Sequence, residues 1–359
     1  MKKKLFTHLF SGFRAFHLTP SPSPKTGEGS TTTPFSPLSC FRRGAGGEVK
    51  GRKLLTRAIA FTSLSLITAL LALTPPTYWH PPADSRIPAG ELGKQIRYGR
   101  ELIAHTAKYL GPKGSVKKLS NGMNCQNCHL DAGTKVLGNN YSAVFSTYPK
   151  FRDRSGAVET IVKRVSDCFE RSLAGKAPDS TSREMKAIVA YMQWLGTDVP
   201  KGQRPDGVGL AKLDYLDRAA DSTKGRLVYV AKCQVCHGVK GEGMKVAGST
   251  EYVYPPMWGP NSYNDGAGLF RLSGFAGYVK NNMPFGANYE SPQLSDEDAW
   301  DVAAFINSMP RPHKDQSSDW PKIASKPVDF PFGPYADSFS ERQHKFGPYQ
   351  PIADARKAK

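Results

Sequence analysis

Two copies of the motif C-x-x-C-H constrain the fold of this 359-residue chain more than any other feature. The first copy occupies residues 125–129 (CQNCH) and the second occupies residues 233–237 (CQVCH). In this motif the two thiols attach covalently to a haem, and the histidine binds the haem iron. One copy alone also fits half of a zinc site, but two copies, each between helical patterns, favour haem. The residues predicted to bind two covalent haem c groups are Cys125, Cys128, His129, Cys233, Cys236 and His237.

The sequence around the two motifs repeats one plan, which predicts two domains. Before the first motif, apolar residues recur with helical spacing from Ile96 to Leu110, and a second helical pattern over residues 183–195 follows it. The second motif also lies between helical patterns, and Ser295 is the predicted N-cap of the last one. The chain is therefore predicted to be mostly α-helical, with two cytochrome c-type haem domains in tandem and an irregular C-terminal wrap.

The composition between the helical patterns sets the predicted domain boundaries. Pro-rich or aperiodic stretches separate the domains, because such stretches build no core. We predict a linker over residues 75–90, an N-terminal cytochrome c domain over 91–200, a second linker over 201–223, a C-terminal cytochrome c domain over 224–311 and a C-terminal extension over 312–359.

The first 74 residues differ from the rest of the chain. Residues 1–57 are basic and of low complexity, and residues 58–74 contain no charged side chain. The uncharged segment is short for a membrane span and long for the core of a signal peptide, so both a membrane anchor and a signal segment are compatible with it. Pro75 and Pro76 stand where a cleavage site is expected, which favours an uncleaved anchor. Either segment sends the rest of the chain into the periplasm.

The formal net charge of +18 bears on the choice of partners, although half of it lies in residues 1–57. A basic protein attracts nucleic acid, small anions or an acidic protein. Haem attachment of this kind occurs outside the cytoplasm, and this disfavours nucleic acid. Small anions and a protein partner remain.

Met283 is the predicted second iron ligand of the second haem. It precedes Pro284 in a loop rich in Gly, Asn and Pro, directly ahead of the last helical pattern. A thioether ligand favours ferrous iron and raises the reduction potential. Met257 is the main alternative, although its surroundings (PPMWG) favour packing against the haem.

Cys168 belongs to neither motif and is the candidate for the second ligand of the first haem. The methionines of the 183–195 pattern fall on its apolar face, which leaves the Cys168 thiolate as a donor that stabilises ferric iron. A disulfide to Cys40 and a structural role are the alternatives. Arg164 and Ser172 lie four residues to either side of Cys168, on one helical face. Guanidinium groups bind oxyanions, so this face suggests an anion site.

Several segments resemble the thiosulfate dehydrogenases, which are dihaem c-type cytochromes of the bacterial periplasm. The matching segments are residues 124–134 (NCQNCHLDAGT), 164–172 (RVSDCFERS), 254–268 (YPPMWGPNSYNDGAG), 332–335 (FGPY) and 343–348 (QHKFGP). The resemblance implies that Cys168 is the second ligand of the active-site haem and that Arg154, Arg164 and Ser172 hold the substrate. Some members have a lysine before the ligating methionine and exchange ligands on reduction. Asn282 occupies that position here, so no such exchange is expected.

The resemblance implies an enzyme that oxidises two thiosulfates to tetrathionate, or catalyses the reverse reaction, at the His129/Cys168 haem. Electrons would pass through the His237/Met283 haem to an electron-transfer protein or to the membrane redox pool. Two alternatives remain open. One is a dihaem electron-transfer cytochrome without catalysis of its own, and the other is the dihaem subunit of a multi-protein sulfur-oxidising complex.

Haem content tests the duplicated motif directly. We expect acid–acetone extraction to leave the colour with the protein, because thioether bonds hold the haem covalently. Mass spectrometry should then count two haem groups per chain. A count of one would contradict the tandem arrangement.

Overall fold

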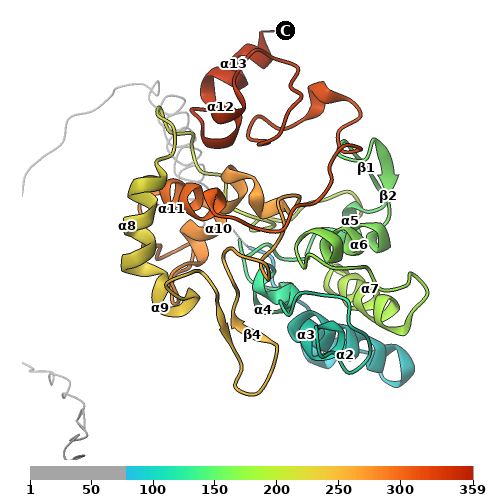
Figure 1. Ribbon diagram of the computed structural model, residues 1–359. Helices are drawn as coiled ribbons and strands as arrows, with labels where there is room; N and C mark the ends of the chain where they lie inside the picture. Colours follow the sequence, from blue (N-terminus) through green and yellow to red (C-terminus); the bar gives the residue numbers. More distant parts are fainter. Residues whose placement is uncertain (1–77, 359) are drawn as a thin grey trace, which may run out of the picture. The chain divides into compact units, whose positions relative to one another are not determined.

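The computed structural model describes residues 78–358 of the chain (Figure 1). The predicted extension over residues 1–57 and the predicted anchor or signal segment over residues 58–74 lie outside the described residues. Within the described part, no helix is both long and apolar enough to cross a membrane. The described part is mostly helical, as predicted, and its two small sheets have two strands each.

The longer helices of the N-terminal half are α2 (Gly90–Ala104), α3 (Thr106–Leu110), α6 (Ile161–Arg171) and α7 (Arg183–Leu195). Helices α2 and α7 pack along each other, and their apolar faces meet in one hydrophobic core. Helix α7 occupies the predicted residues 183–195, and the hydroxyl of Ser182 caps it by accepting a hydrogen bond from the Met185 backbone N–H.

The C-terminal half repeats this arrangement with α8 (Ser222–Lys232), α9 (Gln234–His237), α10 (Leu272–Asn282) and α11 (Asp296–Ser308). Helices α8 and α11 pack along each other as α2 and α7 do, around a second hydrophobic core. The predicted cap is present, since the Ser295 hydroxyl accepts a hydrogen bond from the Asp298 backbone N–H.

Short elements connect these helices, and the first motif begins in one of them, η2. They are η1 (Asp84–Arg86), η2 (Cys125–Asn127), α4 (Leu130–Gly133), α5 (Val144–Thr147), β1 (Lys150–Arg152), β2 (Ala157–Glu159), β3 (Met244–Lys245), β4 (Tyr252–Tyr254), η3 (Gly268–Phe270) and η4 (Ile323–Ser325). The strands pair antiparallel as β1–β2 and β3–β4, and Phe151 lies opposite Val158 in the first pair.

In both halves a glycine lies where the two long helices cross. A β-carbon on Gly99 of α2 would overlap the carbonyl oxygen of Ala187 in α7. A β-carbon on Gly225 of α8 would overlap the carbonyl oxygen of Asp301 in α11 in the same way. The absence of a side chain therefore lets each pair of backbones approach closely.

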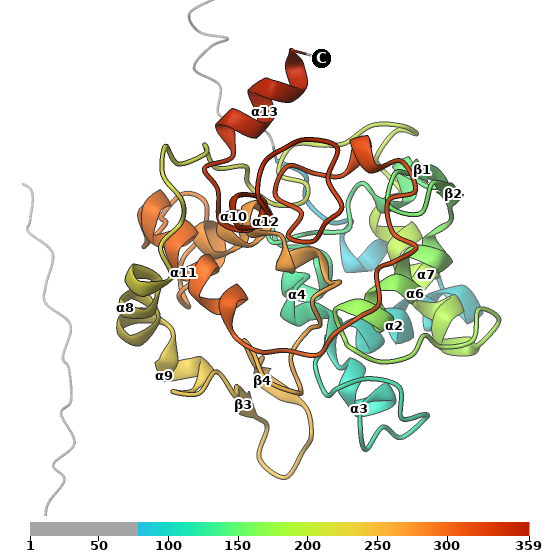
Figure 2. The same ribbon diagram turned by 45° about the horizontal axis from the view of Figure 1, so that its top comes forward.

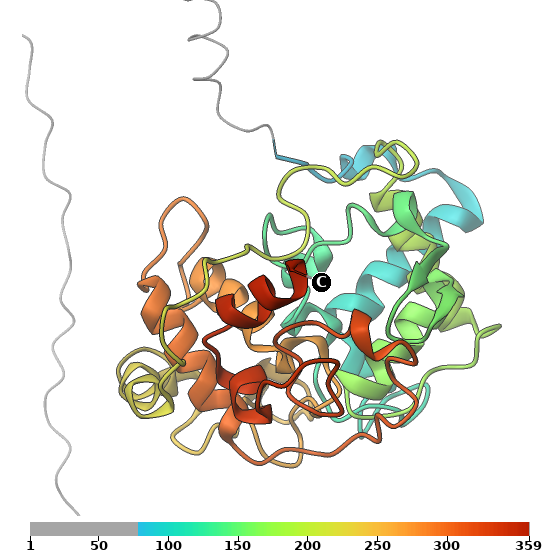
Figure 3. The ribbon, with the colours of Figure 1, turned by 90° about the horizontal axis from the view of Figure 1, so that it is seen from above.

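The C-terminal tail reaches both halves, as Figures 2 and 3 show from two further directions. Asp319 of the tail pairs with Arg171 of α6, and Asp329 pairs with Arg271 beside α10. The tail is less irregular than predicted, because it contains α12 (Glu341–Phe346) and α13 (Gln350–Lys357). Pro351 lies in the first turn of α13, where proline is compatible with a helix.

Substituting the crossing glycine tests the close approach of α2 and α7. We expect Gly99→Ala to lower the free energy of unfolding by about 1–3 kcal/mol, because the methyl group meets backbone that cannot rotate away. Gly274→Ala in α10 is the matched control. Its β-carbon would find its nearest neighbour at 3.8 Å, so we expect a gain of ~0.5–1 kcal/mol from helix propensity. Thermal denaturation measures both, and equal effects would contradict the packing argument.

Candidate active site and haem-binding cavities

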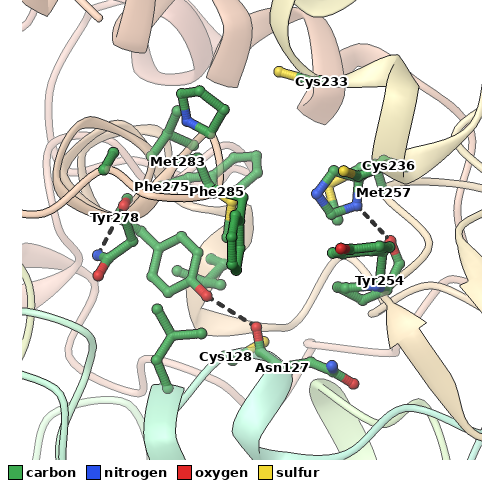
Figure 4. Close-up of a pocket in the computed structure, with 18 of the residues that line it drawn as sticks. Asn127, Cys128, Cys233, Cys236, Tyr254, Met257, Phe275, Tyr278, Met283 and Phe285 are labelled. Atoms are coloured by element: carbon green, nitrogen blue, oxygen red, sulfur yellow. Dashed lines mark hydrogen bonds between the residues drawn. The ribbon is translucent and has the colours of Figure 1, made fainter. Parts of the chain in front are cut away.

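Each C-x-x-C-H motif lines its own cavity. The first cavity, of about 190 Å³, is lined by Cys125, Cys128 and His129. The second cavity, of about 560 Å³, is lined by Cys233, Cys236 and His237 (Figure 4). The cavities are neighbours, because Cys128 lines both of them.

Buried hydrogen bonds fix the first motif against α2 and α3. The hydroxyl of Thr106 accepts a hydrogen bond from the Cys125 backbone N–H at 2.9 Å and donates to the Leu102 carbonyl at 2.7 Å. The side-chain oxygen of Asn124, which is buried, accepts from the Ala107 backbone N–H at 2.8 Å. These bonds set the direction in which the motif enters the cavity.

Both motif histidines donate a hydrogen bond from Nδ1 to a backbone carbonyl. In His129, Nδ1 donates to the Asn139 carbonyl at 2.6 Å, and in His237, Nδ1 donates to the Pro255 carbonyl at 2.8 Å. A carbonyl can only accept, so each ring carries its proton on Nδ1 and keeps Nε2 free for a metal. Burial lowers the pKa of His129 to about 4 and also lowers that of His237. Both rings are therefore neutral near pH 7, the form that binds iron.

The motif thiols lie in apolar surroundings that favour their uncharged form. Burial raises the pKa of Cys125 and of Cys128 to about 12, and that of Cys233 to about 11. These positions are apolar and disfavour a charged thiolate. Uncharged thioethers fit them.

The second cavity separates its two candidate methionines. Figure 4 shows Met283 across the cavity from Cys236 and Met257. His237 follows Cys236 at the end of α9, so Met257 lies on the wall that carries the histidine. A ligand opposite the histidine must come from the other wall, which favours Met283.

Cys168 reaches the first cavity from α6 and lines it together with Arg164 and Ser172. The spacing predicted this shared helical face, and Thr160 caps the helix by accepting from the Lys163 backbone N–H. The thiol carries no disulfide in the described residues, and its alternative partner Cys40 lies outside them. The nearby Cys168 is the main cause that raises the pKa of Arg164. Arg164 therefore keeps its charge beside the sulfur.

Arg154, which the resemblance placed at the substrate, does not line the first cavity. It lies in the turn between β1 and β2, where its guanidinium carbon is 6.0 Å from the centre of the Trp320 ring. Burial and the nearby Arg171 and Arg164 lower its pKa to about 10. Its Nε is buried and has no hydrogen-bond partner among the described residues. Arg154 is thus a half-buried cation close to the site, outside the cavity lining.

Two basic residues of the first cavity were missed from sequence. Lys150 and Arg204 line it beside Arg164, and no acidic residue of the described chain does so. Lys150 belongs to a basic run (KFRDR) that could have suggested it. Arg204 lies in the predicted linker 201–223, where no local pattern distinguishes it.

The two cavities share a wall that both halves of the chain build. Tyr278 of α10 donates from its hydroxyl to the Asn127 carbonyl, inside the first motif, at 2.9 Å. The side-chain amide of Asn282 donates to the carbonyls of Leu137 and Tyr278 at 3.1 and 2.9 Å. Asn282, the residue before Met283, therefore links the two halves through hydrogen bonds of its side-chain amide.

The residues present fit a haem c in each cavity. Two thiols and a neutral imidazole with a free Nε2 line each one. Further sulfur-bearing side chains also line them: Cys168 and Met192 in the first cavity, and Met123, Met257 and Met283 in the second. Apolar side chains complete the linings, including Val165, Phe169, Phe275 and Val279.

Two family models match the chain. Residues 115–200 match the SoxA/TsdA cytochrome c domain, and residues 222–310 match cytochrome c. The thiosulfate dehydrogenase of Psychrobacter arcticus is 40% identical over 242 residues, which are 67% of this chain and 71% of that protein. That of Stutzerimonas stutzeri is 37% identical over 236 residues, covering 66% of this chain and 74% of that protein.

A solved structure is also similar to this chain. It is the thiosulfate dehydrogenase (TsdBA) of Marichromatium purpuratum in its as-isolated form, with a TM-score of 0.61 and 32% identity. The match covers 70% of this chain and 52% of that one, so this chain spans about half of the solved chain.

The fold and both cavities define a c-type cytochrome with two cytochrome c domains and covalently bound haem c. The comparisons narrow this class further. The chain belongs to the thiosulfate dehydrogenase family and is an oxidoreductase.

The opposite walls of the second cavity generate a test of the two methionines. We expect Met283→Gly to abolish the long-wavelength absorption band of thioether-ligated ferric haem, since Met283 lies across the cavity from Met257 and from the wall that carries the histidine. Met257→Leu is the control, and it should keep the band because it preserves apolar volume only. Absorption spectra of the oxidised proteins decide the matter. Loss of the band in Met257→Leu alone would reverse the assignment.

Proposed function

We propose that this chain interconverts thiosulfate and tetrathionate in the periplasm, at a haem held by His129 and Cys168. A second haem, held by His237 and Met283, exchanges the electrons. The observation that carries the proposal is the meeting of Cys168 with the first motif in one cavity. A pure electron carrier gains little from an oxidisable sulfur and an unpaired guanidinium beside its cofactor. An enzyme that couples two sulfur compounds needs both.

Bound haem supplies one-electron redox chemistry, because its iron alternates between the ferric and ferrous states. Substrate binding falls to the side chains. Arg164 has no ion-pair partner among the described residues, and its N–H groups match the oxygens of a sulfonate. Ser172 offers a hydroxyl on the same face of α6, with Cys168 between the two. A sulfonate held by Arg164 and Ser172 thus keeps the outer sulfur of thiosulfate near Cys168.

Arg154 has a more distant part in this proposal. It lies outside the cavity lining, close enough to Arg164 to affect its own pKa. Its half-buried charge adds to the positive potential that attracts a dianion. Direct contact with substrate is assigned to Arg164 and Ser172.

The proposed sulfur chemistry balances at Cys168. Its thiolate and the outer sulfur of one thiosulfate form an S–S bond with the loss of two electrons. A second thiosulfate attacks the thiosulfate-derived sulfur of this adduct, which releases the Cys168 thiolate and tetrathionate. No proton is gained or lost, and the reverse sequence reduces tetrathionate.

The shared wall supports electron exchange between the two sites. Cys128 lines both cavities, so cofactors bound to the two motifs would lie close together. From the second site the electrons pass to an electron-transfer protein or to the membrane redox pool. An assay of the purified protein with thiosulfate and an artificial electron acceptor tests whether this chain catalyses the reaction alone. A subunit of a larger complex would show no turnover in this assay.

Removing the cavity sulfur tests the centre of this proposal. We expect Cys168→Ala to lower turnover in both directions by at least about a hundredfold, because the covalent sulfur step is lost. Both haems should remain attached, since attachment depends on the four motif cysteines. Ser166→Ala in the same helix is the control. Its hydroxyl donates to the Val162 carbonyl and lies outside the cavity lining, so full activity is expected. Wild-type turnover in Cys168→Ala would make the thiol structural.

A further inference from the structure

The lining of the first cavity contains three cationic side chains and, within the described chain, no carboxylate. Lys150, Arg164 and Arg204 line it, and none of the three has an ion-pair partner among residues 78–358. Glu159 is a buried carboxylate outside the lining: it lies opposite Lys150 in the β1–β2 pair, accepts from the Ser155 hydroxyl at 2.7 Å and pairs with Arg152 at 3.9 Å. Unpaired cations in one concavity attract anions.

The three cations come from separate elements and lie at different depths. Arg164 belongs to α6 and is half-buried near Cys168, and Lys150 belongs to β1 and is also half-buried. Arg204 lies on the segment that joins the two halves and is exposed, which places it at the rim. The cavity therefore offers one cation beside the sulfur and two more outside helix α6.

Lys150 is held in place but remains available to a ligand. Its Nζ lies 5.0 Å from the centre of the Tyr148 ring. Tyr148 is itself fixed, because its carbonyl accepts a hydrogen bond from Lys201 at 2.5 Å. Burial and the nearby Arg152, Arg204 and Arg164 lower the pKa of Lys150, so these cations are close enough to repel one another. A bound anion would relieve that repulsion.

The chemistry of the proposed substrates requires two anion sites. Tetrathionate carries a sulfonate at each end of a chain of sulfur atoms, and its formation brings together two thiosulfates with one sulfonate each. Arg164 and Ser172 accommodate only the end nearest Cys168. We propose that Lys150 and Arg204 form an outer subsite, which holds the far sulfonate of tetrathionate and the sulfonate of the second thiosulfate. This inference rests on the proposed function and adds the residues that make it a two-ended site.

The test uses the oxidised holoprotein, which binds tetrathionate without reducing it. We expect Lys150→Gln and Arg204→Gln each to raise the Kd for tetrathionate several-fold and the double variant to raise it at least about tenfold, as charge-assisted hydrogen bonds are lost. In the reduction assay KM should rise in parallel, while kcat stays within about threefold, because the sulfur chemistry at Cys168 is intact. Calorimetry measures Kd, and the haem count verifies folding.

Lys163→Gln provides the matched control for loss of one positive charge. Lys163 directly precedes Arg164, pairs with Asp167 at 2.5 Å and does not line the cavity, so its removal should leave Kd unchanged. If the Kd of the double variant equals that of the wild type, or rises no more than the Kd of Lys163→Gln, the proposal of an outer subsite is wrong. The proposed function would still stand. A wild-type protein that neither binds nor reduces tetrathionate would overturn both.

Discussion

The geometry of the candidate active site depends on one buried ion pair at the end of α6. Arg171 binds Asp319 of the C-terminal tail at 2.7 Å, and the two side chains are only 10% and 8% exposed. Arg171 also donates to the Gly266 carbonyl, and its own carbonyl accepts from the Asn264 backbone N–H. Breaking such a pair by removing one partner costs about 3–5 kcal/mol, because the other charge stays buried. Cys168 lies less than one turn earlier, so the tail and the C-terminal half together hold the sulfur at the first motif.

The same interlocking explains why the two cavities are neighbours. Each cytochrome c domain packs its own pair of crossing helices, and a glycine lets each pair approach. The contact between the domains is more mixed: it includes hydrogen bonds from α10 to backbone carbonyls of the first motif region, a hydrogen bond from the Asn124 amide to Glu251, and the ring of Tyr252, which is buried in the N-terminal core. Together these contacts fix the distance and orientation of the two motifs. A fixed distance between the two cavities favours electron transfer between the cofactors bound in them.

Charge is distributed to match this division of roles. The first cavity gathers cations without a carboxylate in its lining, whereas the second has Asp131 beside Lys135 and Lys232. The lining of the first cavity therefore favours a bound anion more strongly than that of the second. The second cavity is lined by Met283 and Met257 and suits electron exchange.

The sequence by itself determined the features that depend on neighbouring residues. The two C-x-x-C-H motifs, the helix over residues 183–195, the Ser295 cap and the shared face of Arg164, Cys168 and Ser172 all follow from local spacing. Tertiary structure decided which side chains meet across the chain. It placed Cys168 in the cavity of His129, set Met283 across from Met257, added Lys150 and Arg204, and left Arg154 outside the lining. A cavity is lined by whichever segments pack around it, and that packing depends on long-range contacts that no local pattern encodes.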